Sequence, residues 1–250
     1  MSDATRDSGA TRNGEATRNG EAKLEILGRI RSAHAHAADG AELGRSAGIE
    51  PGEPGRPYPV PRDYVRGRAI PGAELVNLLV DRLEDYRAEV IRCADRPHGK
   101  DGIGAAVAGA LAARGLRGGR VGIPPGLDEA WLGDFDGDLV VDDAAVFAPP
   151  ELDALDAVVT GSAVTSADTG TIMLDGSPAC GRRALTLVPD VHICVVRVES
   201  IVAGVPEAIA RLDPVAPITM ISGPSATSDI ELNRVEGVHG PRTLVVVVAG

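Results

Sequence analysis

The chain has few aromatic and few sulfur-containing side chains, and both shortages exclude classes of protein. Aromatic residues make up only 2% of the 250 residues, so we expect no stacking surface for nucleic-acid bases or sugar rings. The three cysteines are widely spaced and form no CxxC pair: Cys93, Cys180 and Cys194. Iron–sulfur clusters and structural zinc sites need about four close ligands. We therefore predict no metal site and no bound cofactor in this chain, and the odd cysteine count argues against a disulfide framework.

Long hydrophobic runs are also missing. The longest, Leu244–Ala249, has the length of a strand, whereas a membrane-spanning helix needs about 20 apolar residues. The N-terminus is polar and lacks the hydrophobic segment of a secretory signal. These absences lead us to expect a cytoplasmic protein without a membrane span.

Positive charge is scarce relative to negative charge. The chain has 25 basic and 36 acidic residues, giving a net charge of −11, and this balance argues against a nucleic-acid partner. Ten acidic residues and no basic residue fall between positions 128 and 156. A calcium loop is not expected there, because Leu139 and Ala145 occupy the positions that need glycine and glutamate. We interpret the segment as a solvated acidic edge, or as a surface that meets a basic patch on a partner.

Four regions follow one another along the chain. Residues 1–21 contain two tandem copies of ATRNGE without a large apolar side chain, which predicts a disordered tail. Residues 22–37 carry Leu24, Leu27 and Ile30 at three-residue spacing, which favours a short amphipathic helix. Residues 38–68 are rich in glycine and proline and are predicted to be a linker. Residues 69–250 are predicted to form the folded domain.

The pattern of the folded domain predicts an α/β protein. Leucines 75, 79 and 83, with Tyr86 and Val90, form one stripe in a helix predicted over 73–92, and a second helix is predicted over 102–114. Helical stretches, including 200–212 with a break at Pro206, then lie between short hydrophobic strands, several of which follow one another directly. This order predicts a mostly parallel sheet with flanking helices and a small antiparallel insert. The expected strands are Arg120–Ile123, Asp138–Val141, Ala157–Thr160, Thr171–Leu174, Ala184–Val188, His192–Val198, Ile218–Ser222 and Thr243–Val248.

Two polar, glycine-rich loops are the candidate sites of chemistry. In the first, Thr160–Thr171, glycines allow close approach of a ligand, and the hydroxyl groups suit a carboxylate, phosphate or sugar. A hydrogen-bonded β-turn explains the same composition. Asp168 is the only acidic residue of this loop.

The second loop, Ile221–Arg242, runs from a strand through a Gly-Pro-Ser turn to a predicted helix start. This arrangement collects anions in open α/β sheets. However, Asp229 and Glu231 fall in the first turn of that helix and already complement its dipole. A neutral, cationic or metal-bridged group is therefore the alternative ligand. His239 lies next to glycine and is the best acid–base candidate, although a lone histidine is more often structural.

Five segments carry a resemblance to a known family and follow that family's order: ILGRIRSA (Ile26–Ala33), PVPRDY (Pro59–Tyr64), TGSAVTSADTGTIML (Thr160–Leu174), RRALTLVPDVHICVV (Arg182–Val196) and SGPSATSDIELNRVEGVHGPRTL (Ser222–Leu244). Over residues 22–250 the chain resembles the lactate utilisation protein C family (LutC/YkgG), which is built on the LUD domain. The tail before residue 22 departs from this likeness.

The resemblance implies a NagB/RpiA/CoA-transferase-like fold and a cytosolic role in oxidising L-lactate to pyruvate. It implies that partner proteins (LutA- and LutB-like) carry the iron–sulfur clusters and that this chain is a non-redox component. Our leading hypothesis is that such a component binds a small carboxylate, another anion or an organic cofactor, or supplies an assembly surface. The alternatives are a stand-alone enzyme or binding protein for a phosphorylated or CoA-type ligand, and a lactate sensor.

Motif positions define the candidate site residues. We predict catalytic roles for His239, Asp168 and Glu231. The predicted ligand-binding residues are Thr160, Gly161, Thr169, Gly170, His192, Gly223, Pro224, Ser225, Thr227, Asp229 and Gly240.

Overall fold

The computed structural model describes residues 24–32, 63–142, 149–227, 235–236 and 239–250. The chain divides into two units, Met1–Asp63 and Tyr64–Gly250. In the first unit, residues 24–32 are helical, inside the range predicted for the N-terminal helix. The predicted tail and nearly all of the predicted linker lie outside the described residues. In the described ranges, no helix combines the length and apolar character needed to span a bilayer.

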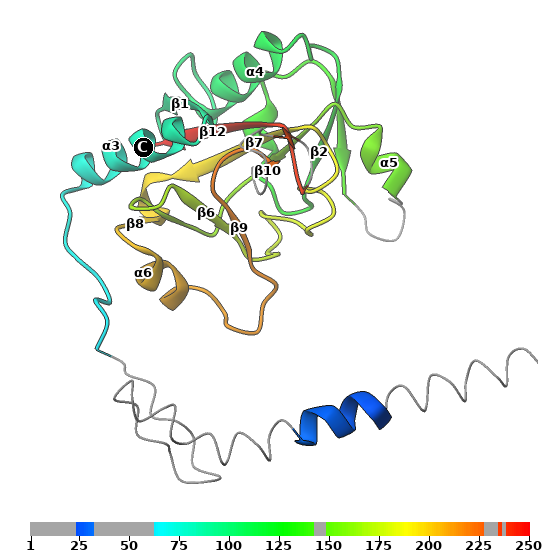
Figure 1. The fold of residues 1–250 in the computed structure, drawn as a ribbon. Coiled ribbons are helices and arrows are strands. Elements are labelled where there is room, and N and C mark those ends of the chain that lie inside the picture. Colours follow the sequence, from blue (N-terminus) through cyan, green and yellow to red (C-terminus); the bar gives the residue numbers. More distant parts are fainter. Residues whose placement is uncertain (1–23, 33–62, 143–148, 228–234, 237–238) are drawn as a thin grey trace, which may run out of the picture. The chain divides into compact units, whose positions relative to one another are not determined.

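The second unit is built on a six-stranded parallel sheet of order β1-β12-β7-β4-β2-β3 (Figure 1). The central strands are continuously apolar because both faces of the sheet are covered. The α/β fold with a mostly parallel sheet is thereby confirmed; the likeness to NagB and RpiA folds stays a prediction. The strands are β1 (Glu89–Cys93), β2 (Arg120–Ile123), β3 (Asp138–Val141), β4 (Ala157–Thr160), β7 (Val191–Arg197) and β12 (Thr243–Ala249).

Different elements cover the two faces of this sheet. Alternate residues of a strand point to opposite faces. In β7, Ile193 and Val195 pack in the hydrophobic cluster of helix α4 (Ile103–Ala113), whereas Cys194 and Val196 pack in the cluster of helix α3 (Gly72–Asp85). The sheet thus forms the middle layer of the unit, and its buried valines supply much of the hydrophobic stabilisation, at about 1.5–3 kcal/mol each.

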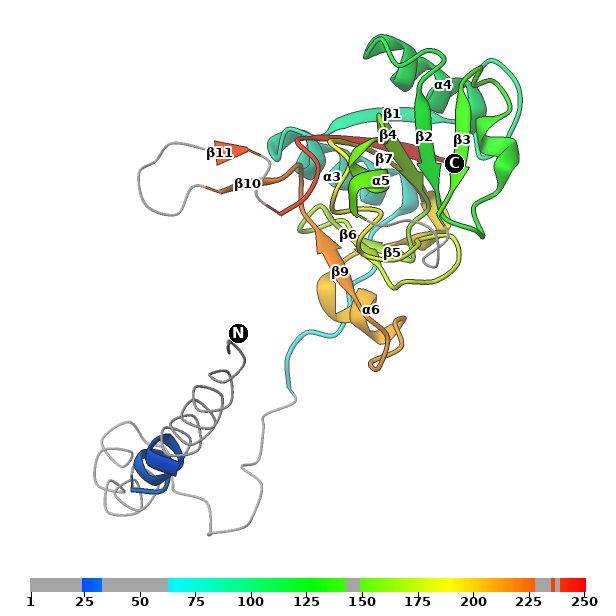
Figure 2. The same cartoon turned by 90° about the vertical axis from the view of Figure 1, so that its right-hand side faces the viewer.

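A second sheet of four short strands packs on the α3 side and forms the predicted insert (Figure 2). It has the order β8-β5-β6-β9, in which β5–β6 and β6–β9 are antiparallel and β5–β8 is parallel. Helix α6 (Val205–Ala210) packs on its other face, where Ala208 joins the cluster of Val164 and Met173. The strands are β5 (Val164–Ser166), β6 (Thr171–Leu174), β8 (Ile201–Val202) and β9 (Thr219–Ile221).

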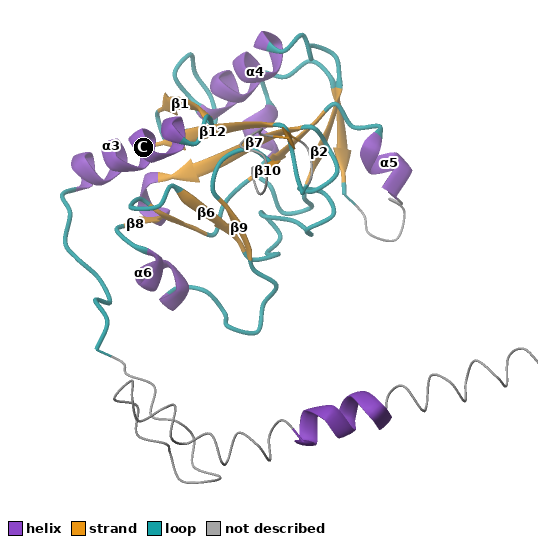
Figure 3. Cartoon of the chain, in the orientation of Figure 1, coloured by secondary structure: helices purple, strands orange, loops and turns teal. Residues whose placement is uncertain are grey.

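The remaining elements are short (Figure 3). Strands β10 and β11 pair as a two-stranded antiparallel ribbon. The elements are helix α5 (Pro149–Asp153), the 3₁₀ turns η1 (Glu129–Leu132) and η2 (Val198–Ser200), and strands β10 (Ala226–Thr227) and β11 (Val235–Glu236).

The helix predicted over 73–92 is too long. Helix α3 ends at Asp85, Arg87 takes the left-handed conformation with φ 67°, and the chain then enters β1. The amide of Ala88 donates to the Leu83 carbonyl at 2.9 Å, a bond typical of a left-handed helix end. Val90 fitted the helical spacing by chance, because its β-branched side chain belongs to a strand paired with β12.

Two other expected elements were wrong. The strand expected at Ala184–Val188 is a series of turns, in which the Leu187 amide donates to the Ala184 carbonyl at 3.2 Å. The helix expected over 200–212 begins with strand β8 and becomes helical only at Val205. Pro206 therefore lies in the first turn of α6, where proline needs no amide hydrogen, and it does not break the helix.

Candidate functional site

A pocket of about 120 Å³ lies at the amino ends of β7 and β12, beneath the Gly-Pro-Ser turn. Strand β9, the turn after it and the segment leading into β12 form much of its wall. Two residues of the turns before β7, Arg183 and Thr186, complete it. The structure therefore brings together six predicted ligand-binding or catalytic residues: His192, Gly223, Pro224, Ser225, His239 and Gly240.

Close backbone packing holds the Gly-Pro-Ser turn in place. Gly223 has φ +85°, and a Cβ atom there would lie 2.7 Å from the Cβ of Tyr86, at the end of α3. The Ser225 amide donates to the Pro241 carbonyl at 2.8 Å, and the His239 amide donates to Ser225 Oγ at 3.1 Å. Only glycine fits this approach at position 223, which explains the glycine of the predicted motif.

His192 belongs to the pocket lining and is completely buried. Its Nε2 lies 2.8 Å from the Thr160 hydroxyl, whereas its Nδ1 is buried and has no hydrogen-bond partner among the described residues. Burial, with a contribution from the charge of Arg183, lowers the pKa of His192 to about 4. The imidazole is therefore neutral at pH 7.

A buried chain of weak hydrogen bonds continues behind His192. The Thr160 hydroxyl donates to Cys194 Sγ at 3.8 Å, and Cys194 Sγ donates to the Gly161 carbonyl at 3.6 Å. Burial raises the pKa of Cys194 to about 12, so the thiol keeps its proton. Thr160 and Gly161 thus act behind the pocket and are not part of its lining. Sequence analysis missed Cys194, although its two-residue spacing from His192 in a strand places both on one face.

Arg183 is an exposed residue that brings positive charge to the pocket and was also missed. Its Nη1 donates to the Thr186 carbonyl at 3.2 Å and to Thr186 Oγ1 at 3.3 Å, and its Nη2 donates to the His239 carbonyl at 2.9 Å. These acceptors are uncharged, and no carboxylate of the described residues forms an ion pair with Arg183. Partial burial lowers the pKa of the guanidinium, but an arginine stays charged at pH 7. The adjacent arginines that begin the family-like motif RRALTLVPDVHICVV were the sequence signal that could have identified Arg183.

The structure describes only some of the residues around His239, the predicted acid–base residue. His239 is exposed and belongs to the pocket lining. Asp229 and Glu231 lie outside the described residues, and Thr227 is described only by its backbone in β10. The catalytic roles of His239 and Glu231 therefore stay predictions.

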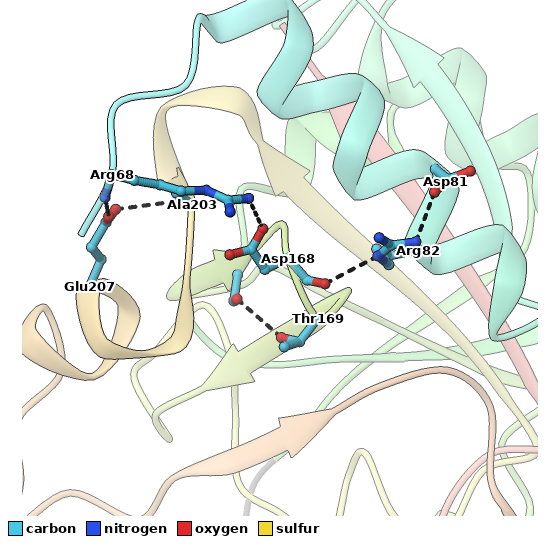
Figure 4. Close-up of polar contacts among 8 residues, drawn as sticks. Arg68, Asp81, Arg82, Asp168, Thr169, Ala203 and Glu207 are labelled. Carbon is cyan, nitrogen blue, oxygen red and sulfur yellow. Dashed lines mark hydrogen bonds and ion pairs between the residues drawn. The ribbon is translucent and has the colours of Figure 1, made fainter. Parts of the chain in front are cut away.

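The structure places Asp168 outside this pocket, on the turn between β5 and β6 (Figure 4). Its carboxylate forms an ion pair with Arg68, and its carbonyl accepts from Arg82 Nε at 3.2 Å. The Glu207 carboxylate accepts from the backbone amides of Arg68 at 2.8 Å and Ala203 at 3.2 Å. Asp168 thus helps to fasten the segment before α3 to the smaller sheet.

Besides the contact of Thr160 with His192, the first loop reaches the pocket through a line of hydroxyl groups. Thr169 Oγ1 lies 2.7 Å from Thr171 Oγ1, which lies 2.9 Å from the Ser222 hydroxyl in the pocket wall. Gly170, with φ +57°, allows close contact with helix α3, since a Cβ atom there would lie 2.9 Å from Arg82 Cβ. The two predicted loops are therefore connected but do not form one site.

The pocket combines a cation, a neutral buried imidazole and a small volume. Among the described residues Arg183 has no carboxylate partner, and such an arginine suits an anionic group. No group of three or more histidine, cysteine or acidic side chains among the described residues is arranged to hold a metal ion.

Comparisons with known proteins agree with this arrangement. The LUD domain family model matches residues 124–249, about half of the chain. The chain is 44% identical over 200 residues to "Lactate utilization protein C" of Deinococcus radiodurans, covering 78% of this chain and 85% of that protein. It is 35% identical over 104 residues to "Lactate utilization protein C 1" of Bacillus mycoides, covering 38% of this chain and 44% of that protein.

A solved structure is similar as well. The crystal structure of a DUF162 family protein from Deinococcus radiodurans matches with a TM-score of 0.57 and 37% sequence identity, covering 73% of this chain and all of the other. These matches confirm the resemblance drawn from the motifs, and the chain belongs to the LUD domain family, within its lactate utilisation protein C group.

Proposed function

We propose that this chain is the non-redox component of a cytoplasmic iron–sulfur system that oxidises L-lactate to pyruvate. In this proposal, partner proteins carry the clusters, and this chain binds a small carboxylate in the pocket of Arg183 and His192. The observation that carries the proposal is the 44% identity to a protein named for lactate utilisation, over most of both chains.

The charge and size of the pocket support a small carboxylate. The Arg183 guanidinium contacts only uncharged acceptors among the described residues, and planar guanidinium groups bind carboxylates well. The pocket has a volume of about 120 Å³, and we expect an organic acid of a few heavy atoms to occupy it.

Growth on L-lactate tests the proposal. A strain of the source organism that lacks this gene is expected to lose growth on L-lactate and to regain it with the wild-type gene. Arg183→Gln removes the charge of the pocket, so this variant should restore growth poorly. Arg211→Gln is the matched control, because Arg211 is an exposed arginine outside the pocket that donates to the Glu199 carbonyl.

Anaerobic affinity purification of the tagged chain gives a second readout. Iron–sulfur proteins should co-purify with both the wild-type chain and Arg183→Gln, since the pocket is not expected to be the assembly surface. Normal growth of the deletion strain on L-lactate would contradict the proposed role, and full growth with Arg183→Gln would contradict the use of the pocket.

A further inference from the structure

We infer that the free edge of strand β3 is a docking site for an extended, positively charged segment of another protein. The segment adds a strand to the six-stranded sheet and places one large apolar side chain in a pocket at the end of β3. This inference does not depend on the proposed function, because it uses residues that do not line the pocket of Arg183 and His192.

The backbone of β3 has one unpaired side. The strand lies at the outer edge of the sheet and, in the described ranges, pairs only with β2 (Figure 2). The amides of Asp138 and Asp142 donate to carbonyls of β2 and of the turn before it, at 2.9 Å and 2.8 Å. Successive residues of a strand direct their backbone groups to opposite edges, so the amides and carbonyls of Leu139 and Val141 point away from β2. These groups have no partner among the described residues and are available to another strand.

The side chains of this edge are apolar and accessible. Leu139 is 36% exposed and Val141 is 44% exposed, and the two share one face of β3. Strand β1, at the opposite edge of the sheet, differs, because its exposed side chains are the charged Glu89 and Arg92. A free edge with exposed apolar side chains is a template for pairing with another chain, and β3 fits this description better than β1.

A second pocket lies where β3 ends. It has a volume of about 540 Å³, and its wall includes Val141 and two prolines, Pro125 and Pro178. This space admits a large apolar side chain such as an indole ring. When a peptide adds a strand to a sheet edge, the backbone hydrogen bonds supply affinity and pockets for alternate side chains supply specificity. The pocket therefore favours a segment with a large apolar residue near the end that pairs with Val141.

The charge around the edge indicates the kind of partner. Segment 128–156, which contains β3, has no basic residue. Arg120 of β2 offsets Asp138 in an exposed ion pair at 3.5 Å, but the excess charge stays negative. A second copy of this chain would bring the same negative segment to the edge, whereas a segment rich in lysine or arginine is complementary to it. Eight acidic side chains of the segment are exposed: Asp128, Glu129, Asp134, Asp136, Asp138, Glu151, Asp153 and Asp156.

Fluorescence anisotropy with labelled synthetic peptides tests this surface on the full chain. The probe is a short peptide in which lysine alternates with valine and which has one tryptophan near its end. The comparison peptide has glutamate in place of every lysine. The chain should bind the lysine peptide at least about tenfold more tightly than the glutamate peptide, and added salt should weaken the binding. Equal binding of the two peptides, or no binding of the lysine peptide, would overturn the inference.

Two variants separate strand pairing from attraction by charge alone. Leu139→Pro removes an outward N–H group without changing the charge, and proline is tolerated on the free side of an edge strand. It should weaken binding of the lysine peptide about tenfold, the equivalent of one hydrogen bond. Val141→Lys adds a positive charge at the mouth of the second pocket and should abolish binding, which keeps the test decisive if the proline variant does not fold. Val215→Lys is the matched control, because Val215 is an exposed valine outside β3 and this pocket, and it should bind like the wild type.

Hydrogen exchange followed by NMR gives a readout of the added strand. The amides of Leu139 and Val141 should exchange rapidly in the free chain and slowly in the complex, while the amide of Val140, which faces β2, is protected in both. Binding without this protection, or equal binding by Val141→Lys and Val215→Lys, would overturn the inference. A dimer in sedimentation velocity that already protects Leu139 in the absence of peptide would also overturn it, because the occupant would then be a second copy of the chain. The growth assay on L-lactate judges the proposed function separately from all of these outcomes.

Discussion

Protonation of His192 is predicted to make the stability of the domain depend on pH. Burial lowers the pKa of this histidine from 6.5 to about 4 in the folded chain. Below pH 6.5 the unfolded chain takes up a proton that the native chain does not. The free energy of unfolding therefore decreases as the pH falls through this range, and it is fully recovered above about pH 6.5. The drop from 6.5 to about 4 corresponds to about 3 kcal/mol, at ~1.4 kcal/mol for each pH unit.

Urea unfolding of the wild-type chain and His192→Gln measures this effect. Carboxylates titrate in both proteins and cancel in the comparison, so the remaining difference reports His192. The variant should lose about 3 kcal/mol less than the wild type between about pH 7 and pH 4. His98→Gln is the control, because His98 is exposed, and it should follow the wild type. The reasoning would be refuted if the wild type and His192→Gln lost stability in parallel.

The groups around His192 do not complicate this assignment. Arg183 stays charged and the Cys194 thiol, with its pKa raised to about 12, stays neutral throughout the range of the experiment. If the free energy of unfolding depends on pH more steeply in the wild type and His98→Gln than in His192→Gln, the additional dependence is therefore due to His192.

Two further predictions concern the stability of the domain and are measured by thermal unfolding. Gly223→Ala should destabilise the chain by about 1–3 kcal/mol, because φ is +85° and the new Cβ would lie 2.7 Å from Tyr86 Cβ. Gly109→Ala, inside α4 with open space around it, should instead gain about 0.5–1 kcal/mol; equal effects would refute the role of φ. Asp142→Asn should cost about 2–4 kcal/mol, since this carboxylate is 2% exposed and accepts two arginine hydrogen bonds at 2.7 Å. Asp190→Asn, in an ion pair that is more than half exposed, should change stability by less than about 1 kcal/mol, and a similar loss in both variants would count against the burial argument.

The strands were the most predictable part of the fold. The valine run of β12 and the apolar run of β7 predict strands from their local sequence alone, because strands covered on both faces are continuously hydrophobic. Local patterns failed where pairing with a distant strand determines the secondary structure. Val90 fits the apolar spacing of a helix, but in the structure it belongs to β1, which pairs with β12.

The acidic segment illustrates the same limit. Asp134, Asp136 and Asp138 are exposed, as a solvated edge requires. Asp142 is buried and holds Arg182 in a bidentate ion pair at 2.7 Å. No spacing rule connects positions 142 and 182, because the sheet brings them together.

The candidate site was partly predictable for a similar reason. The Gly-Pro-Ser turn was predictable from its glycine, because a glycine at this position indicates a tight backbone approach, here to Tyr86. His192 entered only through the family resemblance. Arg183 and Cys194 were missed, because their roles arise from contacts with His239 and Thr160, far away in the sequence.

A crystal structure of the chain with L-lactate tests the central claim most directly. The account predicts one lactate in the pocket at the amino ends of β7 and β12, with its carboxylate on Arg183. An empty pocket at a lactate concentration that saturates the chain in solution, or a lactate bound away from Arg183, would contradict it.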